Sequence, residues 1–340
     1  MVFAGLGITG GYHRLWSHKA YDAHPIVRFF YAYWGACAGQ NSILEWSADH
    51  RVHHKHVDDN DKDPYSAKKG FWYSHMGWIM IDRPVTDDPY KNVKDLQKDK
   101  IVMWQHNNYL FLVLFSNLVV PFGLGFASYA ITGTGGIWGT FILAGFLRFV
   151  LNHHFTFFIN SACHFFGSQP YSDKDTSRDN FLLALVTYGE GYHNFHHTFQ
   201  ADYRNGIRWY HFDPTKWLVK SLSWFGLTTN LKKVSESLIQ KQILLHSINK
   251  QKESFYQKNN LGNACQISQK VEKLYSDLIE TLNDWLETSQ NYIRSLKSKK
   301  LSASEKEDLR TRMDDLKKAI EAKRYMLLEY FKNYSSPEMA

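Results

Sequence analysis

The residues best suited to do chemistry in this sequence are histidines that repeat one spacing. Residues 50–54 read His-Arg-Val-His-His, and residues 193–197 read His-Asn-Phe-His-His. On an α-helix with 3.6 residues per turn, positions i, i+3 and i+4 share one face. Neutral imidazole is the commonest metal ligand, because its ring nitrogen carries a lone pair near neutral pH. Each pattern therefore predicts three imidazoles that project into one small volume and bind metal.

Other histidines are more ambiguous from the sequence alone. His13 and His18 are five residues apart, which places them about 140° apart on a regular helix, so they need a helix end or a distortion to converge. His164 fits a structural role and a ligand role equally well. We interpret the remaining candidates as hydrogen-bonded structural residues: His56, His75, His153 and His154.

The number of histidines bears on the number of ions. A tetrahedral ion takes about four ligands, so eight or nine histidines over-supply one ion and suit two. Imidazoles with few carboxylates nearby suit iron, zinc or copper. A pair of irons can activate dioxygen to remove hydrogen from an unactivated carbon, and a membrane-embedded substrate channel would shield that chemistry from water.

Composition limits the classes of partner. The 340 residues carry a formal charge of +7 and are 16% aromatic, which suits a bilayer interface and an anionic cofactor. No nucleic-acid motif accompanies the charge. The three cysteines are far apart and odd in number, so they predict neither a disulfide framework nor a thiolate metal site.

The hydropathy pattern predicts a membrane protein. Residues 108–131 and 137–158 are long and apolar enough to cross a bilayer as a helical hairpin, with a turn at 132–136. We expect the polar Arg148, His153 and His154 of the return helix to face inward. Three further segments are predicted as the end of a membrane helix, a buried or re-entrant helix and an interfacial aromatic helix: 1–12, 23–44 and 71–81.

The composition changes after Leu231 to Lys, Glu, Ser, Gln and Leu. Apolar residues recur at spacings of three and four over 271–296 and 309–327, and Ser302-x-x-Glu305 is a capping box that starts a helix. We therefore predict a second domain, 231–340, that is an antiparallel helical hairpin or short coiled coil. It carries no catalytic signature, and we interpret it as a packing or oligomerisation element.

Four motifs in order give the first 230 residues a specific resemblance. They read His13-Arg-Leu-Trp-Ser-His18, Glu45-Trp-x-x-Asp-His50-Arg-x-His-His54, Asn160-Ser-x-x-His164 and Gly189-Glu-Gly-Tyr-His-Asn-Phe-His-His197. Together they closely resemble the membrane acyl-CoA Δ9 desaturases, the stearoyl-CoA desaturase family. The run 152–160 looks more like the bacterial members, which implies a bacterial inner membrane with the active site on the cytosolic face.

The resemblance implies an all-α integral membrane fold, with four spans and a cytosolic helical cap that holds two irons. It also implies insertion of a cis double bond into a saturated acyl chain, with O2 reduced to water by two externally supplied electrons. Almost none of the first two spans lies in this sequence, so we expect a mis-set start or a fragment. No fused electron-transfer motif is visible, so the donor is expected to be a separate ferredoxin or b-type cytochrome.

The resemblance also implies roles for individual residues. Asn160 would act through a bound water, Gln40, Trp46 and Thr156 would enclose the bend of an acyl tunnel, and Gly5 would lie near its methyl end. Asn41 and Asp49 would lie near the thioester and the CoA. The implied iron ligands are His13, His18, His50, His53, His54, His164, His193, His196 and His197.

Two departures from the animal members concern the headgroup. Ala48 stands where they carry an arginine, and Asp82-Arg83 stands where they carry a basic pair. Acyl-CoA is the expected substrate, with an acyl-carrier protein or an acyl lipid as alternatives. Two other functions remain open at this point: a membrane diiron hydroxylase, and a histidine-rich metal-binding or metal-transporting membrane protein.

Overall fold

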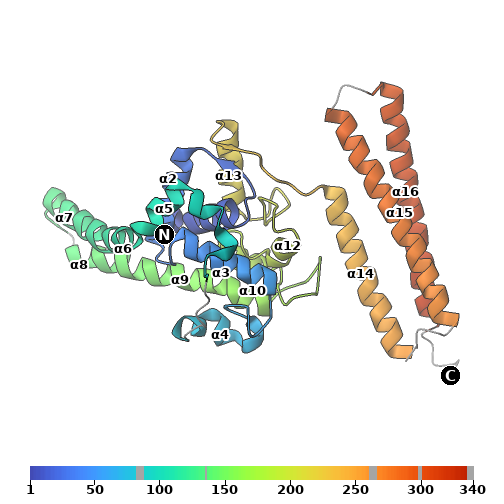
Figure 1. The fold of residues 1–340 in the computed structure, drawn as a ribbon, viewed down its shortest axis with the longest axis horizontal. Helices are drawn as coiled ribbons and strands as arrows, with labels where there is room; N and C mark the ends of the chain where they lie inside the picture. Colours follow the sequence, from blue (N-terminus) through green and yellow to red (C-terminus); the bar gives the residue numbers. More distant parts are fainter. Residues whose placement is uncertain (82–87, 135, 260–265, 298–300, 335–340) are drawn as a thin grey trace. The chain divides into compact units, whose positions relative to one another are not determined.

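The protein forms two compact units, Met1–Lys233 and Val234–Ala340. The computed structural model describes every residue except 82–87, 135, 260–265, 298–300 and 335–340. Both units are mostly helical (Figure 1). The predicted all-α fold needs one correction, because the two-residue strands β1 (Asp22–Ala23) and β2 (Thr228–Thr229) pair antiparallel in the first unit.

A continuous N-terminal helix runs through the first unit. α1 (Val2–Leu6) continues into η1 (Gly7–Ser17), a π-helix in which every residue is buried. It packs closely on α2 (Pro25–Cys37). A Cβ on Gly7 would lie 2.5 Å from the backbone nitrogen of Gly35, so the two backbones can approach this closely only because residue 7 is glycine.

The predicted helix over 23–44 is interrupted in the structure. α2 ends at Cys37, and α3 (Ile43–His56) begins after a turn in which Asn41 has a φ of 71°. Ser42 and Glu45 form a capping box that satisfies the first backbone amides of α3. The helix itself matches the expected bounds at Pro25 and the polar Gln40-Asn41, whereas its extension to Leu44 was wrong, because Ser42 starts a new helix.

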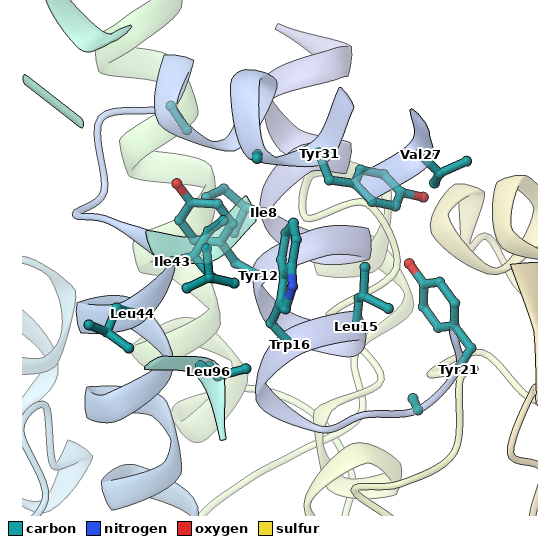
Figure 2. Packing of buried hydrophobic residues seen from close by; sticks show 14 of the residues in the cluster. Ile8, Tyr12, Leu15, Trp16, Tyr21, Val27, Tyr31, Ile43, Leu44 and Leu96 are labelled. Carbon is teal, nitrogen blue, oxygen red and sulfur yellow. The ribbon is translucent and has the colours of Figure 1, made fainter. Parts of the chain in front are cut away.

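The main core of the first unit lies between η1, α2 and α3. Figure 2 shows Tyr12 and Trp16 of η1 beside Ile43 of α3, and all three side chains are buried. Tyr31 of α2 contributes a fully buried ring to the same cluster. Because η1 and α3 carry the first two histidine motifs, this core fixes how those motifs face each other.

Short helices follow α3. The predicted aromatic helix 71–81 is split at Met76, whose φ of −145° ends α4 before a 3-10 turn begins. Residues 82–87, including Asp82-Arg83, lie outside the described residues. The elements of this segment are η2 (Ala67–Lys69), α4 (Phe71–His75), η3 (Gly77–Met80), η4 (Lys91–Val93), η5 (Leu96–Lys98) and α5 (Lys100–Asn107).

Two long apolar helices run side by side, as predicted (Figure 1). Tyr109–Thr132 and Ile137–Phe165 are each long and apolar enough to cross a membrane, and little of either is buried in the protein. This exposure distinguishes them from the core helices of a soluble domain. Their elements are α6 (Tyr109–Leu114), η6 (Phe115–Val119), α7 (Val120–Thr132), α8 (Ile137–Thr140), η7 (Phe141–Leu147), α9 (Arg148–Asn160) and α10 (Ala162–Phe165).

The polar residues of the return helix have partners inside the unit, as expected. Arg148 hydrogen-bonds the Asn117 side chain. His153 Nε2 lies 3.2 Å from the Gly39 carbonyl oxygen, and His154 Nδ1 lies 3.0 Å from His75 Nε2. Each polar group is thereby satisfied without facing lipid.

Three short helices complete the first unit: α11 (Phe181–Val186), α12 (His193–Thr198) and α13 (Pro214–Trp224). The second unit consists of α14 (Glu236–Asn259), α15 (Gln266–Lys297) and α16 (Ala303–Asn333). The capping box at Ser302 is confirmed, and α15 packs against α16 around buried residues such as Leu282 and Leu327. The sequence did not predict α14, which adds Ile248 to the same core.

Candidate metal centre

Nine buried or half-buried histidines meet in the first unit as two groups. In each group the ring nitrogens that could bind an ion all lie within 4.8 Å of one another. The five-histidine group is His13, His18, His50, His54 and His196. The four-histidine group is His53, His164, His193 and His197. The structure thus brings together all nine residues that the resemblance implied as ligands.

Each H-x-x-H-H motif contributes to both groups. On α3, the i and i+4 residues His50 and His54 join the five-histidine group, while His53 joins the other. On α12 the assignment is reversed, because only His196 joins the five-histidine group. The expectation of three imidazoles in one volume was too simple. Positions i and i+4 are about 40° apart around a helix, whereas i+3 and i+4 are about 100° apart.

The π-helix η1 explains how His13 and His18 converge. A π-helix closes i→i+5 hydrogen bonds, and the His18 backbone N–H donates to the His13 carbonyl at 3.1 Å. The two ring centroids are therefore only 4.8 Å apart. His13 Nε2 lies 3.0 Å from His196 Nε2, and His18 Nε2 lies 2.8 Å from His50 Nε2.

His164 enters the four-histidine group from a break in the return helix. Ser161, with φ −105° and ψ −81°, ends α9, and α10 then carries His164. His164 Nδ1 lies 2.8 Å from Thr176 Oγ1. Its Nε2 is buried, and within the described residues it has no hydrogen-bond partner. A metal ligand requires such a nitrogen, which lies among other imidazoles and has its lone pair free.

Carboxylates orient two of the imidazoles from outside. Glu190 lies 2.9 Å from His13 Nδ1, and Asp63 lies 2.8 Å from His53 Nδ1. Metal-binding histidines commonly donate their second N–H to a carboxylate, which fixes the tautomer and the ring orientation. Each carboxylate thus directs the Nε2 lone pair of its histidine into its group.

The sequence analysis missed both carboxylates. Glu190 lies within the motif that begins at Gly189, so its place three residues before His193 could have identified it. Asp63 lies in the charged turn after α3, where several acidic residues are equivalent from the sequence. Only the fold selects one of them.

Glu190 belongs to a buried ionic network. The Arg14 guanidinium donates to Glu190 at 2.8 Å and also contacts Asp213 at 3.0 Å. Burial alone would raise the pKa of Glu190, but His13 and Arg14 outweigh it and lower this pKa to about 2. Glu190 is therefore a carboxylate at neutral pH and can accept a hydrogen bond from the Nδ1–H group of His13.

Five histidines of the two groups have a lowered pKa that keeps them neutral. Burial, followed by the neighbouring imidazoles, lowers the pKa of His50 and His54 well below its usual value. The same causes act on His193, His196 and His197. A neutral imidazole has a free lone pair, so these side chains are in the form that binds a metal.

The donor set fits two ions of iron, zinc or copper. All nine donors are imidazole nitrogens, which suit these metals. Nitrogens bound to one ion at about 2.1 Å lie roughly 3.0 to 3.4 Å apart at right or tetrahedral angles. The His13–His196 pair at 3.0 Å and the His54–His196 pair at 3.0 Å agree with that spacing.

A cavity of about 380 Å³ adjoins both groups. Its lining includes His13 and His50 of one group and His53 and His193 of the other. It also includes six residues that the resemblance implied at the substrate or water site: Gln40, Asn41, Trp46, Asp49, Thr156 and Asn160. Gly5 is not among the lining residues.

Two contacts shape the cavity wall. Gln40 Nε2 donates to Thr156 Oγ1 at 2.8 Å and so joins the turn after α2 to α9. The Trp46 ring stacks on His50, with centroids 4.7 Å apart. A side chain of the cavity wall and a candidate ligand are therefore in direct contact.

Comparison with known proteins identifies the family. Residues 1–226 match the fatty acid desaturase family. The chain belongs to that family. The match covers both histidine groups, the two outer carboxylates and the cavity-lining residues.

Named relatives agree with this assignment. A protein of Schizosaccharomyces pombe named "Probable acyl-CoA desaturase" is 46% identical over 246 residues, which are 72% of this chain and 50% of that protein. Acyl-CoA desaturase 1 of Saccharomyces cerevisiae is 42% identical over 254 residues, 73% of this chain and 48% of that protein. The sn-1 stearoyl-lipid 9-desaturase of Synechocystis is 37% identical over 232 residues, 68% of this chain and 69% of that protein.

The chain spans about half the length of the two fungal desaturases that it matches.

Proposed function

We propose that this protein is a diiron desaturase that inserts a cis double bond, at the Δ9 position, into a saturated fatty acyl thioester, acyl-CoA. The observation that carries the proposal is the contact between the two groups of imidazoles and one cavity of about 380 Å³. Membership of the fatty acid desaturase family and the names of the relatives support the reaction and its position.

The nine histidines would hold the two irons through ring nitrogens, five in one group and four in the other. Bound iron would supply the activation of O2. In the net reaction, two adjacent CH2 groups each lose one hydrogen, and O2 is reduced to two waters with two further electrons and two protons. A separate ferredoxin or b-type cytochrome would deliver those electrons.

The protein's own residues would place one C–C bond beside the metals. The Gln40–Thr156 hydrogen bond and the Trp46 ring form a wall beside His50, which would bend the acyl chain toward a cis-like shape. Apolar residues such as Phe157 and Ile159 also line the cavity and would exclude water from the reacting carbons. Asn160, on the same lining, would hold a water beside the four-histidine group.

The acyl carrier is proposed to be CoA, with Asn41 and Asp49 at the thioester end of the cavity. Ala48 is buried, and its carbonyl oxygen accepts a hydrogen bond from Asn92 Nδ2 at 2.8 Å. Because its side chain is an uncharged methyl group, this position offers no charge to a phosphate of CoA. An acyl lipid, as in the name of the Synechocystis relative, is the alternative carrier. The two long apolar helices would anchor the protein in a bacterial inner membrane, with the metal centre on the cytosolic face.

The test is expression in cells that lack unsaturated fatty acids, followed by identification of the lipid products and their double-bond positions. The wild type is expected to yield cis-Δ9 products, and His53→Ala or His197→Ala to yield none, because each removes a donor from the four-histidine group. His56→Ala is the matched control, since His56 ends α3 outside both groups. Hydroxy acids in place of alkenes would identify a hydroxylase, and retained desaturation in both histidine variants would refute the ligand assignment.

A further inference from the structure

The turn that follows α3 contains a second buried carboxylate beside the one that contacts His53. Asp63 Oδ1 lies 2.8 Å from His53 Nδ1, and Asp63 Oδ2 accepts the backbone N–H of Asp58 at 3.0 Å. Asp58 is also buried, and its φ of 65° lies in the left-handed region, which aspartate and asparagine tolerate better than most residues. The turn therefore holds the Asp58 carboxylate in one place inside the protein.

Asp58 binds a residue from a distant loop, Thr176, at two points. The Thr176 backbone N–H donates to Asp58 Oδ2 at 2.7 Å, and the Thr176 hydroxyl donates to Asp58 Oδ1 at 2.8 Å. A carboxylate without a proton can only accept hydrogen bonds, so the single hydroxyl proton of Thr176 points to Asp58. The Thr176 oxygen then has only lone pairs to offer to a third partner.

That third partner is His164. Its Nδ1 lies 2.8 Å from Thr176 Oγ1. Because this oxygen can only accept, His164 Nδ1 carries the proton and donates it. A neutral imidazole has one N–H, so the free lone pair of His164 lies on Nε2. Nε2 is the buried atom that has no hydrogen-bond partner within the described residues, and His164 belongs to the four-histidine group.

We propose that Thr176 is a positioning residue of the metal centre, which passes the constraint of the Asp58 carboxylate to His164 and fixes its metal-binding tautomer. The inference rests on the proposed function, because it requires the four-histidine group to hold an ion. The turn after α3 then orients two ligands of that group, His53 directly and His164 through Thr176. An outer acceptor of this kind fixes the tautomer and the ring orientation of a metal-binding histidine.

Thr176→Val tests the role, because valine keeps the branched shape of threonine and removes the hydroxyl. The full-length protein is purified from its membrane, loaded with ferrous iron and dialysed against increasing chelator. One iron should be bound about 10- to 100-fold more weakly than in the wild type, since His164 loses the acceptor of its Nδ1–H. The iron of the five-histidine group should be retained as in the wild type. Thr176→Ser keeps the hydroxyl and should restore wild-type retention of both irons.

Asp58→Asn tests the step before Thr176. Asparagine also tolerates a positive φ, so the turn can keep its backbone. Its amide can donate to the Thr176 oxygen, which would turn the hydroxyl proton toward His164 Nδ1 and favour the wrong tautomer. This variant should weaken the same iron, and adding Thr176→Val to it should cause little further loss, because both changes act through one contact. Two losses that multiply in full would overturn the relay.

Two control variants separate positioning from the loss of a hydrogen bond alone. Thr187→Val removes a buried hydroxyl that donates to the Leu183 carbonyl oxygen at 2.7 Å, and Asp61→Asn changes an exposed carboxylate in the same turn as Asp58. Both should retain iron as the wild type does. An equal iron loss in Thr187→Val, or wild-type unlike retention in Thr176→Ser, would assign Thr176 a structural role only.

The failure of this inference can be distinguished from the failure of the proposed function. A wild type that binds no iron refutes the histidine centre and, with it, the role of Thr176. A wild type that binds about two irons, together with unchanged retention in Thr176→Val and Asp58→Asn, refutes the role of Thr176 alone. If Thr176→Val does not accumulate, Thr176→Ala and Asp58→Asn provide the same test.

Discussion

The two histidine groups are made from the same helices but differ in how complete they are. α3 and α12 supply three nitrogens to each group in opposite proportions. The five-histidine group is completed by His13 and His18 from η1, whereas the four-histidine group receives only His164. The difference shows that the repeated motifs create a shared framework and that the non-repeated residues decide how many imidazoles each group contains.

The outer carboxylates of the groups also differ. Asp63 is ten residues from His53 and is held by the backbone N–H groups of Asp58 and Tyr65 at 3.0 and 3.2 Å. Glu190 is far from His13 in the sequence and is held by the Arg14 side chain. The orientation of His53 therefore depends on one local turn, whereas that of His13 depends on distant segments that a buried arginine connects.

The largest expected effect separates the two groups by ligand count. His164→Ala leaves three imidazoles in its group, one fewer than the roughly four of a closed tetrahedral site, so iron should fall toward one ion per chain. His18→Ala leaves four in the other group and should retain close to two ions. Elemental analysis of the purified membrane protein measures both, and equal losses in the two variants would remove the distinction between the groups.

A smaller effect is expected from the outer carboxylates. Asp63→Asn and Glu190→Gln should each weaken iron binding about 10- to 100-fold, because the second N–H of one ligand loses its anionic acceptor. Each variant should affect one of the two ions, as measured by iron retained during dialysis against increasing chelator. Asp61→Asn, in the same turn as Asp63 but outside both groups, should retain iron as the wild type does. An equal loss of iron in Asp61→Asn would mean that the negative charge of the turn, and not the Asp63–His53 contact, supports iron binding.

The carboxylate assignment has a second readout. If Asp63 and Glu190 only stabilise the fold, their variants should lower the unfolding temperature of the metal-free protein as much as that of the loaded protein. A positioning role predicts a larger decrease for the loaded form, since tight binding of the metal to the folded state adds stability that scales with affinity.

The smallest effect is expected from the second unit. Both histidine groups lie within Met1–Lys233, and α15 and α16 pack around a core of their own. Deleting 234–340 should leave iron per chain unchanged and spare desaturation, although it would alter assembly if this unit joins copies of the chain. A folded truncation that keeps its iron but makes no product would show that the second unit is needed for turnover.

The sequence revealed the ligands more fully than it revealed their arrangement. Spacing alone selected the H-x-x-H-H motifs, and the family resemblance added His13, His18 and His164. The convergence of His13 and His18 depends on the π-helix η1, whose i→i+5 hydrogen bonds follow from packing and leave no periodic signal in the sequence. Which histidines of a motif join which group depends on where the facing helix lies. The local sequence does not determine that position.

In the fold, too, the features that depend on local sequence were predictable, and those that depend on tertiary contacts were not. The two long apolar helices were predictable because their length and hydropathy are local properties. The polar Gln40-Asn41 indicated where α2 stops, but the left-handed conformation of Asn41 and the new helix that begins after Ser42 were not predicted. Asp63 could not be separated from its acidic neighbours, because only the folded turn brings its carboxylate to His53.

Iron analysis of the intact wild-type protein, purified from its membrane, tests the central claim most directly. Two groups of imidazoles that each hold one ion predict about two irons per chain. A preparation that is folded and loaded to saturation yet binds one ion or none would contradict the account.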